Sequence, residues 1–129
     1  EVKISEGIPD IRDAYKNSDV LLAPIKGPGG TRLKILEAMA SGLPVVTTEV
    51  GIEGLDVVDG RHALIRDGED ELVTATARVL DNRQLAQRLA NEARRLVLSR
   101  YSWKRSAQVL DLIYRDVAQR IASFPNEEN

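Results

Sequence analysis

The chain has 129 residues, which suits one domain, and its apolar fraction of 43% is that of an ordinary globular protein. The net charge of -2 arises from mixed signs, so the chain lacks the basic excess of a nucleic-acid-binding surface, and we expect no nucleic-acid partner. With no cysteine and one histidine, the composition excludes thiolate and histidine-rich metal sites, and no apolar run reaches the ~18 residues of a membrane span.

All nine glycines lie between Gly7 and Gly68, and the first half of the chain alternates apolar runs with turns. The elements expected there are a strand at 2–5, a helix at 10–17, a strand at 20–23, a helix at 31–41, a strand at 44–48 and a short strand at 63–65. The run at 20–23 is continuously apolar, which is typical of a parallel strand covered on both faces. Gly42 is placed to end the second helix, and residues 49–55 are expected to form a loop.

The second half is predicted to be helical, with helices at 69–80, 83–100 and 103–123. The last helix carries an apolar stripe that contains Ala107, Leu110, Ile113, Val117 and Ile121. Trp103 opens this helix and is expected to anchor it by packing. We expect residues 1–123 to form the domain and residues 124–129 to form a disordered tail.

This order of elements predicts an α/β fold with a partial, Rossmann-like, doubly wound parallel sheet and a helical C-terminal segment. Such sheets bind ligands at the carboxyl ends of their strands. The turn after residue 24 and the loop at 49–55 would share that rim if their strands are neighbours. So few strands suggest the second half of a larger domain, whose open sheet edge would favour a homodimer by edge pairing or strand exchange.

The turn between the strand at 20–23 and the next helix reads KGPGGTRLKILE. Glycine lets the backbone approach a ligand closely, and a helix N-terminus offers free N–H groups and a partial positive charge. Arg32 and Lys34 add full positive charges, so the turn is suited to a phosphate or diphosphate. A tight turn with nothing bound is the alternative on spacing alone. Arg32 and Lys34 lie two residues apart, so a regular helix points them to different sides.

Glu37 lies in a helix whose other residues are apolar almost all round, a pattern that predicts a buried helix. A carboxylate in such a place needs a partner or access to a polar cleft. One possible partner is nearby backbone, in a purely structural role. The other is a ligand with hydroxyl groups, because an ionised carboxylate only accepts hydrogen bonds.

The stretch GGTRLKILEAMASGLPVVTTEVG, residues 29–51, resembles the C-terminal, donor-binding domain of GT-B fold glycosyltransferases, in particular the retaining family 4 (group 1) enzymes. Residues 8–24, 59–82 and 100–117 resemble other parts of that domain, so the likeness covers nearly the whole chain. It implies a glycosyltransferase that takes a nucleotide-sugar as donor and needs no metal or other cofactor. The expected location is cytoplasmic, with peripheral attachment to the inner membrane face left open for the full protein.

The resemblance also implies roles for particular residues. The donor diphosphate would be bound by Gly29, Gly30, Thr31, Arg32 and Lys34. Glu37 would bind the hydroxyls of the nucleotide ribose. The family's usual E-x(7)-E pair would place a first glutamate where this chain has Gly29, so the chain is similar to a GGTRLK subgroup, and the role of that glutamate cannot be carried over.

Two further parts of the family pattern are missing from this chain. No counterpart of the family's basic pair for the diphosphate is present, and the N-terminal acceptor domain is absent. We therefore expect the chain to be inactive in isolation, with its catalytic residues unassigned.

Two other functions stay open at this point. A non-catalytic α/β regulatory module that binds a nucleotide or phosphate is one, although a receiver domain fits poorly because Asp19 precedes its strand instead of ending it. A GT-B epimerase or phosphorylase relative is the other. The segment leaves the donor sugar, the base, the acceptor and the stereochemical course open.

Overall fold

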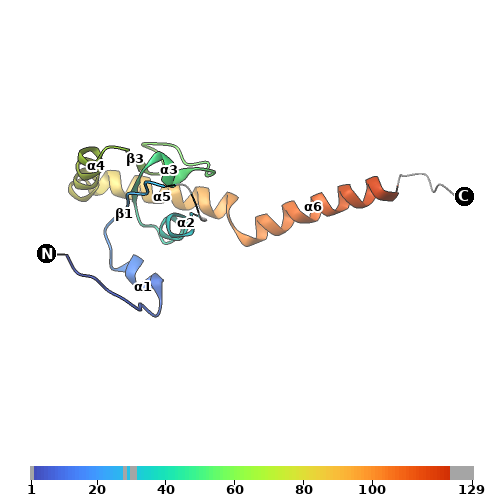
Figure 1. Ribbon diagram of the computed structural model, residues 1–129, viewed down its shortest axis with the longest axis horizontal. Coiled ribbons are helices and arrows are strands. Elements are labelled where there is room, and N and C mark those ends of the chain that lie inside the picture. Colours follow the sequence, from blue (N-terminus) through green and yellow to red (C-terminus); the bar gives the residue numbers. More distant parts are fainter. Residues whose placement is uncertain (1, 28, 30–31, 123–129) are drawn as a thin grey trace, which may run out of the picture.

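The computed structural model describes residues 2–27, 29 and 32–122, and the statements below concern those residues. The elements, in chain order, are α1 (Ile11–Lys16), β1 (Leu21–Ala23), α2 (Leu33–Ala40), β2 (Val45–Thr47), α3 (Glu49–Ile52), β3 (Leu64–Ile65), α4 (Glu69–Asp81), α5 (Arg83–Arg100) and α6 (Trp103–Ala122), as Figure 1 shows. Most predicted elements are confirmed. The strand expected at 2–5 is wrong, because this segment is irregular and exposed, and the expected tail at 124–129 lies outside the described residues.

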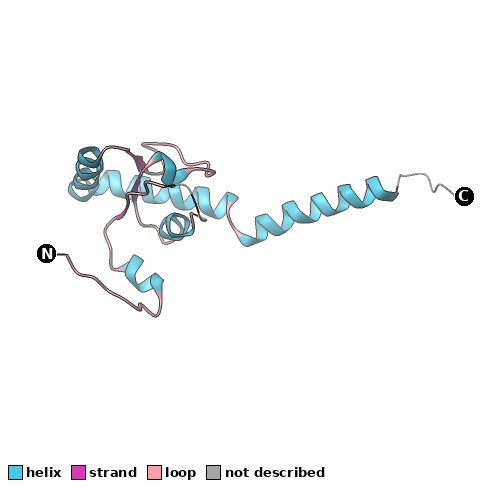
Figure 2. Ribbon diagram, in the orientation of Figure 1, coloured by secondary structure: helices cyan, strands magenta, loops and turns pink. Residues whose placement is uncertain are grey.

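The three strands form one parallel sheet in the order β1-β2-β3. In its register, Leu22 pairs with Val46 and Val46 with Leu64, while Ala23 pairs with Thr47 and Thr47 with Ile65. Figure 2 shows how small this sheet is beside the helices around it. Neither β1 nor β3 has a second neighbour among the described strands, and the expected pairing of two copies along such an edge stays a prediction.

Helices cover both faces of the sheet, as a doubly wound fold requires. Against one face, α2 and the second half of α5 contribute buried side chains to a core that contains Val45 and Ile65. Against the other face, α4 and the first half of α5 pack around Val46 and Leu64. The helix residues in these two cores are, respectively, Ile35, Ala38, Met39, Ala93 and Val97, and Leu72, Ala75, Val79, Leu85 and Leu89.

The second core does not reach β1. Leu22 lies on that face and is 42% exposed, so the prediction that this strand is covered on both faces is wrong for its central residue. The reason is the position of β1 at the edge, beyond the strands over which α4 and α5 pack.

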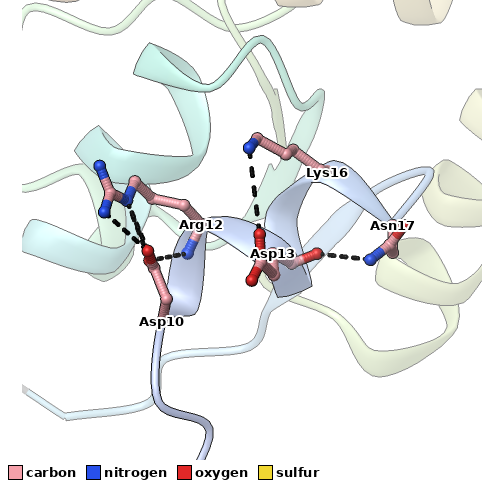
Figure 3. A network of polar contacts seen from close by, with 5 residues as sticks. All are labelled: Asp10, Arg12, Asp13, Lys16 and Asn17. Atoms are coloured by element: carbon pink, nitrogen blue, oxygen red, sulfur yellow. Dashed lines mark hydrogen bonds and ion pairs between the residues drawn. The ribbon is translucent and has the colours of Figure 1, made fainter.

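Helix α1 is stabilised by polar contacts of its own residues, which Figure 3 shows. Asp10 is its N-cap and accepts a hydrogen bond from the Arg12 amide at 2.9 Å. The Arg12 guanidinium also binds this carboxylate, and it is the main cause that lowers the pKa of Asp10 to about 2. At the other end, the Asn17 side chain donates to the Asp13 carbonyl at 2.9 Å. These contacts favour helix 11–16 locally and leave Tyr15 to pack inward.

Helix α2 begins at Leu33, two residues later than expected, and ends in a Schellman motif. Gly42 has a φ of 79°, its N–H donates to the Met39 carbonyl at 3.1 Å, and the Leu43 N–H donates to the Ala38 carbonyl at 3.0 Å. The predicted C-terminal glycine is therefore confirmed. The prediction of a helix buried all round is wrong, because Leu33 and the polar residues of its outer face are exposed.

Helix α6 extends away from the rest of the molecule (Figure 1). Its predicted apolar stripe is exposed over Ala107, Leu110, Ile113 and Val117, while the side chain of Ile121 lies outside the described part. Trp103 is 91% exposed, so its expected role as a packing anchor is wrong for this structure. None of the helices within the described ranges has the length and apolar character needed to cross a membrane.

Candidate functional site

The loops that follow the three strands lie together at the carboxyl-end rim of the sheet. The Thr48 hydroxyl donates to the Ile25 carbonyl at 2.6 Å and links the loops after β2 and β1. The Glu49 amide donates to the Asp67 carboxylate at 3.1 Å and links the loops after β2 and β3. Lys26 forms an ion pair with Glu69 at 2.6 Å across the same rim. The predicted juxtaposition of the glycine turn and the 49–55 segment is thus confirmed.

The floor of this rim is built from two threonines and a glycine. Thr47 is fully buried, and its hydroxyl donates to the Ala23 carbonyl at 2.8 Å. Thr48 is the N-cap of α3, where its hydroxyl accepts from the Gly51 N–H at 3.1 Å. The segment expected to be a loop therefore begins with the short helix 49–52, and the Thr48 cap is the sequence signal for it.

The glycine turn itself is described at Gly27 and Gly29, whereas Gly30 and Thr31 lie outside the described residues. Gly29 has a φ of 133°, a backbone conformation that glycine adopts far more readily than other residues. No described heavy atom lies within 4 Å of the position that a Cβ would take on Gly29. The backbone at Gly29 thus has a conformation that favours glycine, and no described atom occupies the space a side chain would need.

Arg32 points inward, which its sequence position did not indicate. Its guanidinium Nη1 donates to the Gly29 carbonyl at 2.9 Å, and its Nη2 lies 3.5 Å from the Glu53 carboxylate. The Arg32 side chain is 8% exposed, against 69% for Glu53. Arg32 therefore connects the glycine turn with the segment after α3, and in this conformation its charge faces protein groups.

Lys34 has the opposite environment. It lies in the first turn of α2, it is exposed, and it forms no ion pair with any described residue. Arg32 occupies the N-cap position but supplies no side-chain cap to α2, and no described carbonyl accepts the Leu33 or Lys34 N–H. The start of α2 thus carries one exposed cationic side chain, and its first two N–H groups have no acceptor among the described residues.

Glu37 is exposed on the outer face of α2 and has one side-chain partner among the described residues. The Tyr15 hydroxyl lies 3.2 Å from Glu37 Oε2 and 3.4 Å from the Lys34 carbonyl. Burial, followed by the charge of Glu37 and this hydrogen bond, raises the pKa of Tyr15. The partner of the Glu37 carboxylate in this structure is thus a side chain from another helix, α1, and not nearby backbone. The sequence alone did not indicate this contact, although a buried tyrosine hydroxyl usually has a partner.

Of the predicted residues, the structure brings Lys34 and Glu37 to one face. They are three residues apart, so their side chains are neighbours on the helix surface, with Glu37 about 4.5 Å further from the N-terminus along the axis. Arg32 lies at the same end of the helix but is turned away. An anionic group of a ligand would meet the cation of Lys34. Hydroxyls next to that group would meet the Glu37 carboxylate, which accepts hydrogen bonds. Within the described ranges, no three His, Asp or Glu side chains are grouped so as to hold a metal ion.

The single histidine lies outside this rim and is buried. His62 Nδ1 accepts a hydrogen bond from the Val58 N–H at 3.0 Å. Burial and then the charge of Arg61 lower the pKa of His62, with a smaller opposing effect from Glu92. The arrangement favours the neutral imidazole. It also holds the 58–62 turn, a structural role that the sequence did not reveal.

Comparison with known proteins shows what this fold and sequence are similar to. The family model described as "Glycosyl transferases group 1" matches residues 1–82. A D-inositol 3-phosphate glycosyltransferase of Corynebacterium urealyticum is 30% identical over 123 residues, which cover 89% of this chain and 27% of that protein. An MMP alpha-(1->4)-mannosyltransferase of Mycolicibacterium hassiacum is 32% identical over 97 residues, 73% of this chain and 24% of that protein.

The fold also matches a solved structure. The crystal structure of the C-terminal domain of a glycosyl transferase group 1 family protein from Francisella tularensis superimposes with a TM-score of 0.66 at 21% identity. The match covers 79% of this chain and 53% of that one. The chain spans about a quarter of the length of the curated relatives it matches.

Proposed function

This chain belongs to the group 1 glycosyl transferases, and we propose that it forms part of the donor-binding domain of an enzyme that transfers a sugar from a nucleotide-sugar to an acceptor hydroxyl. The observation that carries the proposal is the shared exposed face of Lys34 and Glu37 at the start of α2, beside the rim where the strand loops meet. Ligands of α/β sheets bind at such a rim.

The two side chains suit neighbouring parts of one ligand. A nucleoside diphosphate carries its phosphates next to its ribose. The Glu37 carboxylate would accept hydrogen bonds from the ribose hydroxyls, and Lys34 would pair with the diphosphate. The backbone at Gly29, Gly30 and Thr31, with the first N–H groups of α2, would approach the same phosphates. Arg32 would support this site by holding the Gly29 carbonyl.

The chemistry asked of these groups is stabilisation of a leaving group. When the bond between the sugar and the diphosphate breaks, negative charge grows on the diphosphate. A cation and backbone dipoles that are already in place stabilise this charge without having to reorganise. No nucleophile, metal or cofactor is needed from this segment for that task, and the nucleotide-sugar is a substrate.

We assign binding of the acceptor to other parts of the full-length enzyme. Because the chain spans about a quarter of its curated relatives, we expect the 129 residues alone to show no transfer when incubated with nucleotide-sugars and acceptors. Turnover by the isolated chain would contradict this expectation.

The binding role can be tested by calorimetric titration of the chain with UDP, GDP and ADP. We expect at least one of these nucleotides to bind. Lys34→Ala and Glu37→Ala should each lower the affinity for that nucleotide about tenfold or more. Lys104→Ala is the matched control, because Lys104 is an exposed lysine of α6, away from the rim. Absence of binding to all three nucleotides, or binding unchanged by both substitutions, would overturn the proposal.

A further inference from the structure

We propose that Tyr15 is a positioning residue for Glu37, whose hydroxyl holds carboxylate oxygen Oε2 so that Oε1 is presented to the ribose hydroxyls. This inference rests on the donor-binding function proposed above. It adds a residue from α1, outside the glycine turn and α2, to the machinery that would distinguish ribonucleotides from nucleotides lacking those hydroxyls.

The first support is the contrast in burial between the two partners. Tyr15 is 9% exposed and belongs to the larger core, in which it packs with residues of α2 and the sheet. Glu37 is exposed on the outer face of α2. The phenol ring is thus fixed by packing, while the carboxylate extends into solvent on several rotatable bonds.

The second support is the geometry of the hydroxyl. It lies nearer to Glu37 Oε2, at 3.2 Å, than to the Lys34 carbonyl, at 3.4 Å. A charged acceptor also forms the stronger hydrogen bond, so the proton favours the carboxylate. One oxygen of Glu37 is then engaged, and Oε1 receives no hydrogen bond from the described part of the chain.

The third support is that α1 holds its own shape. Asp10, Arg12 and Asn17 stabilise both ends of this helix through contacts within residues 10–17. The backbone that carries Tyr15 is therefore held by contacts within the chain. A side chain that is already held in its binding geometry loses less conformational entropy when the ligand arrives.

The test compares a nucleoside diphosphate that the chain binds with its 2′,3′-dideoxy analogue, by calorimetry. The wild type should bind the dideoxy compound about tenfold or more weakly. Tyr15→Phe should lower the affinity for the ribonucleotide about twofold to tenfold and leave the affinity for the dideoxy compound unchanged. The reason is that the substitution affects only the part of the binding free energy that comes from the ribose hydroxyls. Tyr114→Phe, an exposed tyrosine of α6, is the matched control and should change neither affinity.

The outcomes separate the two proposals. If the wild type fails to bind, or binds both compounds equally, the donor-binding function fails and this inference with it. If the wild type discriminates and Glu37→Gln removes the discrimination, but Tyr15→Phe retains it in full, the function stands and the role of Tyr15 is refuted.

An ultraviolet titration of the tyrosines tests the contact without a ligand. Glu37→Gln should lower the pKa of the phenol that Tyr15→Phe removes from the titration curve, because the carboxylate contributes to raising it. An unchanged tyrosine titration in Glu37→Gln would show that the contact is absent and would overturn the inference, whatever the stability of the Tyr15 variant.

Discussion

A Cβ atom on Gly51 would lie 2.1 Å from Thr47 Oγ1, far inside van der Waals contact. Gly51 is buried in α3, and its φ is not positive, so glycine is required there for space and not for backbone conformation. The Thr47 hydroxyl cannot move away without losing its hydrogen bond to the Ala23 carbonyl. The close approach of α3 to β2 therefore depends on a glycine at this position.

Gly51→Ala should destabilise the chain by about 1–3 kcal/mol, because the methyl group forces α3 off the sheet or displaces Thr47. Urea denaturation of both proteins measures this difference. Gly27→Ala is the control, since no described atom lies within 4 Å of its Cβ position and its φ is ordinary. Equal stability of the Gly51 variant and the wild type would contradict the packing described here.

Thr48→Ala should cost about 1–2 kcal/mol, since it removes the N-cap of α3 and leaves the Ile25 carbonyl without its donor. Thr48→Ser keeps the hydroxyl and should recover most of that loss. Thermal unfolding of the two variants provides the comparison. A serine variant as unstable as the alanine variant would show that the methyl group, and not the hydroxyl, is what matters.

Substitutions of Arg32 and Lys34 should have different effects, the first on stability and the second on nucleotide binding. Arg32→Ala removes the bond to the Gly29 carbonyl and leaves Glu53 without this ion-pair partner, so we expect a loss of about 1–3 kcal/mol in the free energy of unfolding. Lys34→Ala removes an exposed cation and should stay within about 0.5 kcal/mol of the wild type, while weakening nucleotide binding. Denaturation and calorimetry on the same preparations decide this, and a destabilised Lys34 variant would count against its assignment.

His62 should make stability depend on pH above the range of the carboxylates. Its pKa in the folded chain is lowered from the ordinary 6.5, and protonation at Nδ1 would break the bond from Val58. As the pH falls, the imidazole takes up a proton at a higher pH in the unfolded chain than in the folded chain. The folded chain therefore loses stability below pH about 6.5. Above that pH, the contribution of His62 to the free energy of unfolding is complete.

The fold also lowers the pKa values of four carboxyl groups, those of Asp10, Asp59, Glu69 and Glu92. These shifts change stability only near or below the ordinary values of 3.8 for Asp and 4.5 for Glu. Between pH about 7.5 and 5.5, the slope of the unfolding free energy should therefore come from His62. Urea denaturation at several pH values should show this slope in the wild type and not in His62→Gln. A slope that persists in the variant would refute the assignment.

Much of the fold could be predicted from local signals. The helix at 83–100 was predicted with the bounds that the structure gives to α5, and Gly42 ends α2 as expected. Apolar runs located the three strands, and their sequence order predicted a common rim for the loops that follow β1 and β2. These features depend on neighbours within a few residues or on the hydrophobic period, and both can be read along the chain.

The predictions that were wrong concern features that depend on contacts with distant parts of the chain. Residues 2–5 have a strand-like sequence, but a strand exists only where a partner strand accepts its hydrogen bonds. Trp103 and the stripe of α6 are apolar, yet periodicity cannot show whether another part of the protein covers them. For Arg32, sequence spacing predicted the end of the helix on which it lies but not the side to which it turns.

By itself, the sequence determined the family, the α/β class, the glycine turn before α2 and the presence of a carboxylate one turn after a lysine, because these follow from residue identity and spacing. Only the tertiary structure decided that Arg32 binds Gly29 and Glu53 while Lys34 stays exposed, and that Tyr15 reaches Glu37 from 22 residues away. The physical reason is that a side chain's partners are set by how separate elements pack, and packing depends on the whole chain at once.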